Sequence, residues 1–218
     1  MPKTSRPREE VELVRERILE TALQMLIEDG FNTMSMRKLA SRLDMTAANI
    51  YNYFSSKDEL YLMLQTRGFE QLYDDLSTVF SEHSDPIIRG EAMIRAFIDF
   101  GIGNRYYYEI MFNRNTPKYT DYVGTEMESI AFNEKSTALK SFHLTAQCLS
   151  EIFAVNGAGG VDPENIRYHA IQLWCGLHGI VSLYNSRVLQ EVEEGPEKVI
   201  DWMVDNIVRV YFNESSAS

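Results

Sequence analysis

The stretch from Met36 to Lys57 constrains the fold most, because it reads as two short helices joined by a tight polar turn. Apolar positions fall on one face of each helix, namely Leu39, Ala40 and Leu43 in the first, and Ile50 and Phe54 in the second. Helices this short are not stable alone and must pack against a third. Thr46 is suited to cap the second helix, because its hydroxyl accepts a free backbone N–H. The pattern predicts a helix-turn-helix, with an ordinary corner between two helices as the alternative.

Charge is divided unevenly along the 218 residues, whose net charge is −11. Residues 1–57 hold nine Lys and Arg against eight Asp and Glu, whereas residues 58–218 hold twelve against twenty-four. An acidic second part repels nucleic acid and restricts contact to the face where cations gather. Those cations are Arg37, Lys38, Arg42 and Lys57. The outer face of the second helix carries no acid, so it can approach a polyanion.

Helical spacing continues through the rest of the chain, with no convincing strand. Apolar residues recur over 11–29 and supply the third helix, and Gly30 is placed to end it. Further helices are expected over 58–80, 86–100, 106–112, 119–155 (with an interruption near Asn133 left open), 163–188 and 199–210. We therefore predict an all-α protein of about nine helices. The expected parts are a flexible basic arm (1–10), the helix-turn-helix domain (11–57), a ligand-binding and dimerisation domain (58–213) and a tail (214–218).

The first 64 residues carry motifs of a known family. They include Met36-Arg37-Lys38-Leu39-Ala40 and, above all, Ile50-Tyr51-Asn52-Tyr53-Phe54-Ser55-Ser56-Lys57-Asp58-Glu59-Leu60. This part resembles the DNA-binding domain of the TetR family of transcriptional regulators, with the match running over 15–64. Trp174 and His178-Gly179 resemble a subgroup marked by a Trp and a His-Gly in the regulatory domain. The resemblance implies a ligand-responsive regulator, expected to be a repressor.

The resemblance also implies which residues contact double-stranded operator DNA. Those positions are Arg37, Thr46, Ala47, Ala48, Asn49, Tyr51, Asn52, Tyr53 and Lys57. Side chains at the start of such helices hold phosphates, and amides in the recognition helix read base edges. Asp44 departs from the family pattern, which has Gly in the turn. Aspartate tolerates left-handed backbone but adds a negative charge near DNA.

Two late helices carry an apolar seam that predicts a homodimer. An isolated helical hairpin with such a seam exposes more apolar surface than a soluble monomer tolerates, whereas two hairpins can pair into a four-helix bundle. The expected interface is Ala170, Leu173, Leu177, Ile180, Tyr184, Met203 and Ile207. The alternative is that this seam packs entirely within one subunit.

Aromatic residues are concentrated in the second part and could line a pocket for a small hydrophobic or aromatic effector. The candidates are Tyr107, Tyr108, Phe112, Tyr122, Trp174 and His178. Filling of the helical core is the alternative for each aromatic taken singly. Trp174 and His178 are four residues apart on one helix face, opposite the seam, and form the best pair.

Other functions find less support in the sequence. No HExxH or GxSxG motif occurs, and the four histidines lie on different expected elements, so we expect no enzyme and no catalytic residue. No third ligand accompanies Cys175 and His178, so neither a metal nor another cofactor is expected. An adaptor with the same fold, regulated by a protein partner, is the serious rival. The chain lacks an apolar signal region or membrane span, which predicts a cytoplasmic protein.

Overall fold

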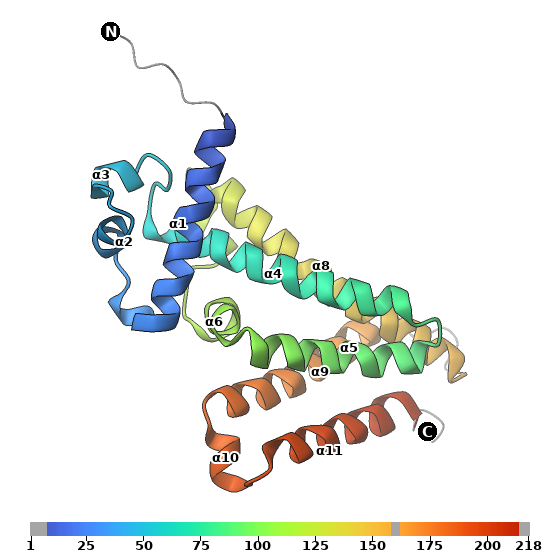
Figure 1. The fold of residues 1–218 in the computed structure, drawn as a ribbon. Helices are drawn as coiled ribbons and strands as arrows, with labels where there is room; N and C mark the ends of the chain where they lie inside the picture. Colours follow the sequence, from blue (N-terminus) through green and yellow to red (C-terminus); the bar gives the residue numbers. More distant parts are fainter. Residues whose placement is uncertain (1–7, 158–161, 214–218) are drawn as a thin grey trace. The chain divides into compact units, whose positions relative to one another are not determined.

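The computed structural model describes residues 8–157 and 162–213, and over these ranges it contains helices and no strand (Figure 1). This confirms the all-α prediction. The elements are α1 (Arg8–Asp29), η1 (Phe31–Thr33), α2 (Met36–Arg42), α3 (Ala47–Ile50), α4 (Lys57–Glu82), α5 (Pro86–Gly103), α6 (Arg105–Tyr108), η2 (Glu109–Asn113), α7 (Tyr119–Tyr122), α8 (Glu128–Val155), α9 (Pro163–Asn185), α10 (Val188–Val192), α11 (Pro196–Val208) and η3 (Arg209–Asn213).

The difference between these eleven α-helices and the expected nine lies in short elements. The segment expected over 119–155 is two helices, and the interruption falls at Gly124, where the backbone turns with φ of +79°, and not near Asn133. The short helix α10, which was not among the expected helices, separates α9 from α11. Helix α1 begins at Arg8, so the end of the expected arm is helical. Residues 1–7 of the arm and the tail 214–218 lie outside the described residues.

The chain forms two compact units that differ from the expected domains. Unit 1 comprises residues up to Gly68 together with Glu109–Lys135, and unit 2 comprises Phe69–Tyr108 and Ser136 onward. The boundaries fall within α4 and α8. A functional division after residue 57 stays a prediction.

In unit 1, α1 supplies the predicted supporting helix for α2 and α3. Apolar side chains from all three helices and the start of α4 are buried together: Ile18, Leu19, Ala22, Met25, Leu26, Leu39, Ala40, Leu43, Ile50, Phe54 and Leu60. Gly30 follows the last residue of α1 with φ of +79°, so it ends the helix as predicted. The short helices are thus held by shared burial and not by their own backbone bonds.

A second cluster in unit 1 joins the start of α4 to the 109–135 segment. Leu62, Tyr122 and Ala131 are buried there, with Met127 and Ile130 packed against them. Gln65 donates from Nε2 to the Ile110 carbonyl at 2.8 Å. This segment therefore belongs to the same compact unit as the helix-turn-helix.

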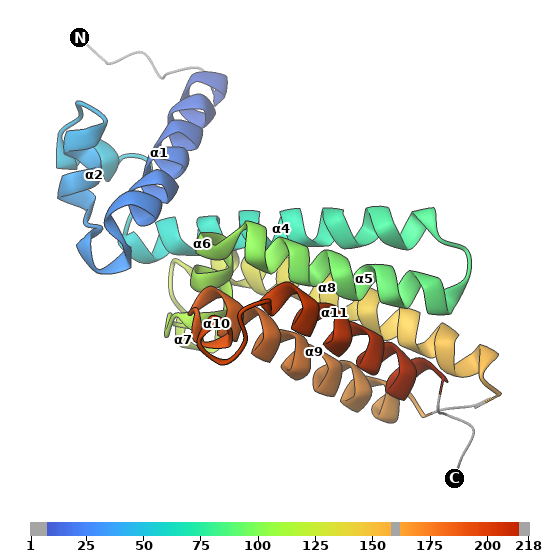
Figure 2. The ribbon, with the colours of Figure 1, turned by 60° about the horizontal axis from the view of Figure 1, so that its bottom comes forward.

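Unit 2 is built on α5, which lies alongside α9 and α11 (Figures 1 and 2). Asp85 caps α5 by accepting from the backbone N–H groups of Ile87 and Ile88, and Pro86 occupies the first turn. At the other end, Asn185 donates to the Gly101 carbonyl at 2.9 Å. Helix α5 is therefore fixed at both ends, by its own cap at the start and by Asn185 of α9 at the end.

No described helix is long and apolar enough to cross a membrane.

A substitution at Gly101 tests how closely the helices of unit 2 are packed. A Cβ at this position would lie 2.6 Å from Val181 Cγ1 and 3.0 Å from the Tyr108 ring, and both of these side chains are fully buried. We expect Gly101→Ala to lower the free energy of unfolding by about 1–3 kcal/mol through overpacking. Gly103→Ala, at an open position on the same helix, is the matched control. Equal urea midpoints for the two variants would contradict this packing.

Candidate nucleic-acid interface and internal aromatic cluster

The turn between α2 and α3 has the geometry expected of a helix-turn-helix. Ser35 caps α2 by accepting from the Lys38 backbone N–H, and Thr46 caps α3 by accepting from Asn49 N at 3.2 Å. Asp44 adopts the left-handed conformation, with φ of +53°. The caps and this turn fix where α3 begins.

The exposed surface of α3 and the residues after it consists of small and hydrogen-bonding side chains. Ala48, Tyr51 and Asn52 are exposed, and Asn49 is half-buried with its Oδ1 accepting from Asn52 Nδ2 at 3.4 Å. Side-chain amides can form paired hydrogen bonds with adenine in the major groove, and a phenol can donate to a phosphate. Ala47 is half-buried, and Thr46 is exposed and uses its hydroxyl as the cap.

Tyr53, which was predicted to contact DNA, is the exception, because its side chain is not on the exposed surface. The α-helix ends at Ile50, and the Tyr53 backbone N–H bonds to the Ile50 carbonyl at 2.9 Å, three residues back. This tighter turn rotates the ring inward, where it is 7% exposed. Tyr53 therefore belongs to the core of unit 1.

The four predicted cations differ in availability. Arg37 and Lys38 are exposed. Arg42 is paired with Glu28 at 2.6 Å, and hydrogen bonds from Gln24 and Arg42 hold the pKa of Glu28 below its ordinary value. Lys57 donates from Nζ to the Met34 carbonyl at 3.0 Å, and the same ammonium group lies 5.0 Å from the centroid of the Tyr61 ring, so it is partly engaged within the protein. The positive face is thus smaller than the sequence indicates.

A buried carboxylate that was not among the predicted site residues holds the segment between α3 and α4. Glu59 is 7% exposed and accepts from the Ser55 backbone N–H at 2.6 Å, the Ser55 hydroxyl at 2.8 Å and Arg15 at 3.1 Å. Arg15 of α1 also donates to the Tyr53 carbonyl and lies over the Phe54 ring. The Ser56-x-x-Glu59 spacing, a capping box, is the signal that could have pointed to it.

Unit 2 brings together three of the six predicted effector-site residues. The Tyr108 hydroxyl is hydrogen-bonded to His178 Nδ1, and the His178 ring lies 5.2 Å from Trp174 between ring centroids. Phe97 from α5 and Phe142 from α8 extend this group, at 6.1 Å from His178 and 6.4 Å from Trp174. We call these five residues the aromatic cluster.

Burial keeps the polar members of the cluster uncharged. It raises the pKa of Tyr108 and lowers the pKa of His178 to about 4, because each charged form would lose hydration. At neutral pH the pair therefore consists of a phenol and a neutral imidazole.

The other three predicted effector residues lie elsewhere. Tyr107 is half-buried in unit 2, whereas Phe112 lies in η2 of unit 1. Tyr122 is part of the buried cluster of unit 1, where burial, followed by the nearby Asp58, raises its pKa to about 12. The structure therefore assigns Tyr122 to the core, the alternative that the sequence had left open for each aromatic.

The predicted dimer seam also needs correction. Ala170, Leu173, Leu177 and Ile180 are at most 5% exposed within the single chain, because this side of α9 packs against α5. Tyr184, Met203 and Ile207 are half-buried. The four buried side chains cannot meet a second copy while this packing persists. Packing within one subunit therefore accounts for these four residues, whereas an interface role of Tyr184, Met203 and Ile207 stays a prediction.

No group of three or more metal-ligating side chains occurs among the described residues. Cys148 is buried and Cys175 exposed, and both are free thiols.

Asp44 offers a test of the turn geometry. A β-branched residue is strained at positive φ, so we expect Asp44→Val to lower the free energy of unfolding by about 1–2 kcal/mol relative to Asp44→Gly. Thermal unfolding of the two variants measures the difference. If valine is tolerated as well as glycine, the left-handed turn is absent in solution.

Two family matches cover most of the chain. Residues 18–64 match the bacterial regulatory proteins of the tetR family, and residues 91–207 match the tetracyclin repressor-like C-terminal domain. An HTH-type transcriptional regulator of Mycobacterium tuberculosis, Rv0681, is 24% identical over 181 residues, which span 83% of this chain and 74% of the relative.

Solved structures show the same fold. A protein with unknown function from Rhodococcus sp. RHA1 superposes with a TM-score of 0.72 at 21% identity, over 98% of this chain and all of that one. AibR, solved in complex with isovaleryl coenzyme A and operator DNA, gives 0.62 at 18% identity, over 91% and 97%. With the helix-turn-helix and both family matches in place, the chain belongs to the TetR family of DNA-binding transcriptional regulators.

Proposed function

We propose that this regulator is a repressor that binds a pseudo-palindromic operator as a homodimer and is released by a small hydrophobic or aromatic effector. The observation that carries the proposal is the acid-free surface of Ala48, Asn49, Tyr51 and Asn52 on the capped α3. Asn49 and Asn52 would read base edges in the major groove. Tyr51, Thr46 and Arg37 would hold phosphates on either side.

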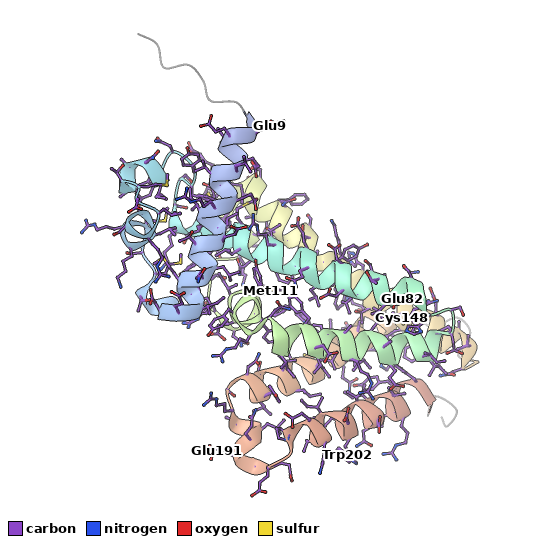
Figure 3. The ribbon with its side chains drawn as sticks, in the orientation of Figure 1. Glu9, Glu82, Met111, Cys148, Glu191 and Trp202 are labelled. Carbon is purple, nitrogen blue, oxygen red and sulfur yellow. The ribbon has the colours of Figure 1, made fainter. Side chains whose placement is uncertain are left out.

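A dimer is needed because one short helix reads too few base pairs for a specific site. Two recognition helices about 34–36 Å apart would meet successive major-groove faces of one operator. With the inner seam of α9 occupied, we assign the contact to exposed faces of α9 and α11. Ile171, Leu183 and Trp202 are exposed there, and Trp202 is labelled on α11 in Figure 3. Gly176 and Gly179 have open space around them, which permits close approach of a partner helix.

The effector would act on unit 2 through the aromatic cluster. Tyr108, Trp174 and His178 provide apolar area with hydrogen-bonding atoms, the composition usual for small-molecule sites. A difference of about 1–3 kcal/mol in effector affinity between DNA-bound and free forms would suffice for regulation. Control by a protein partner is the alternative. A melting-temperature screen of small hydrophobic compounds separates the two, because an effector stabilises the fold by mass action.

Operator binding tests the proposal most simply. A labelled duplex from upstream of the chain's own coding region is titrated with parent protein and with Asn52→Ala. Loss of a paired amide contact should weaken binding by about 1–3 kcal/mol, roughly 5- to 150-fold. Asn115→Ala, another exposed asparagine of unit 1, is the matched control and should bind like the parent. If Asn52→Ala binds as tightly as Asn115→Ala, the assigned reading surface is wrong.

A further inference from the structure

The connector between α1 and α2 sets where α2 begins. It runs from Gly30, whose φ is +79°, through η1 to Ser35, the cap of α2. Helix α2 carries Arg37 and Lys38, two exposed cations. A shift of the connector would therefore move these cations relative to the phosphates of an operator.

Hydrogen bonds hold the connector near its two ends. The Thr33 hydroxyl donates to the Gly30 carbonyl at 2.8 Å, and Lys57 of α4 donates to the Met34 carbonyl at 3.0 Å. Neither bond involves the ring of Phe31, the first residue of η1, which is half-buried. The place of this ring must therefore come from another contact.

Arg114 contacts the Phe31 ring from a segment far along the chain. Its guanidinium carbon lies 4.4 Å from the ring centroid, and both side chains are half-buried. A cation over an aromatic face is attracted by the ring's π electrons, and the attraction grows as water is excluded. Both residues belong to unit 1, although Arg114 lies in the part that matches the C-terminal domain of the family. A side chain from that part thus holds the connector that precedes α2.

The segment around Arg114 is itself well fixed. The Arg114 N–H donates to the Glu109 carbonyl at 3.0 Å, and its Nε lies 3.0 Å from Glu109 Oε1. Gln65 of α4 donates from Nε2 to the Ile110 carbonyl at 2.8 Å and to the Thr116 hydroxyl oxygen at 3.2 Å, on either side of Arg114 in the sequence. Because these contacts already order the guanidinium, little further side-chain entropy is lost when it holds the ring.

We propose that Arg114 is a positioning residue for operator binding, which acts by holding Phe31 and, through it, the start of α2. This inference rests on the proposed function, in which α2 and α3 carry the contacts to operator DNA. Arg114 does not itself bind DNA, because its guanidinium is engaged by Phe31 and Glu109. Without this contact the connector would be freer in the unbound protein. DNA binding would then have to restrict it again, which lowers affinity.

A double-mutant cycle on the operator duplex tests this role. Arg114→Met keeps the apolar stem and removes the guanidinium, and Phe31→Leu keeps an apolar side chain and removes the ring. We expect each variant to bind about threefold to tenfold more weakly than the parent, the loss expected for a partly desolvated cation–aromatic contact. The double variant should bind no more weakly than either single one, because both changes remove the same contact. Additive losses, or parent-like binding by either single variant, would overturn the proposal.

Two controls separate positioning from other roles. Glu109→Gln removes the ion pair with Arg114 and leaves the Phe31 contact, so it should bind the operator like the parent. An equal loss in Glu109→Gln and Arg114→Met would overturn the proposal. The salt dependence of binding should be the same for Arg114→Met and the parent, because the bound complex keeps the same phosphate contacts. A slope smaller by about 0.9 would mean that Arg114 binds a phosphate directly, which would also contradict the positioning role.

All variants are compared at a temperature where circular dichroism shows them folded, so a loss of stability alone does not change the measured affinity. Asn52→Ala in the same assay distinguishes this inference from the proposed function. If Asn52→Ala is weakened while Arg114→Met and Phe31→Leu bind like the parent, only the positioning role fails. If the parent itself does not bind the duplex, the proposed function and the positioning role are both contradicted.

Discussion

The reading surface depends on one buried carboxylate. Helix α3 spans four residues, far fewer than a helix needs to persist alone, so its position must come from its surroundings. Burial of Ile50 supplies part of this support, and Glu59 fixes the segment after α3 by holding both the Ser55 backbone and Arg15, which in turn holds the Tyr53 carbonyl. A buried charge that lost its partner would be strongly destabilising, so loss of one of these contacts would also weaken the others. Through them α1, α4 and the segment that follows α3 are joined.

The two units differ in how their buried polar groups are satisfied. Unit 1 buries a carboxylate and satisfies it with a guanidinium, a hydroxyl and a backbone N–H, which fixes one geometry. In the described part of unit 2, the buried polar residues are Thr137 and Ser141, and buried atoms of Ser141, His169 and Gln190 have no hydrogen-bond partner. The arrangement in unit 1 suits a surface that must hold its shape against DNA.

Sequence reasoning located the helix-turn-helix because its signals are local. The cap at Thr46 and the left-handed turn at Asp44 depend on neighbouring residues only, and the structure has both. Tyr53 was misplaced because the pattern assumed a regular helix beyond Ile50. The seam of α9 was misassigned for another reason: periodicity shows that a helix has an apolar face, but not which partner covers it. The Ser56-x-x-Glu59 spacing indicates only the start of a helix, and Glu59 was missed because its contact with Arg15, forty-four residues away, depends on the tertiary fold.

The central claim, that the Glu59 contacts position the DNA-reading helix, is tested most directly by operator affinity in Glu59→Gln. The amide nitrogen of glutamine would face the donors of Ser55 or Arg15, so we expect at least a tenfold loss of affinity. Glu28→Gln, which removes a surface pair with Arg42, is the control and should bind like the parent. Circular dichroism of both variants at the assay temperature confirms that they are folded. Parent-like affinity in a folded Glu59→Gln protein would contradict the account.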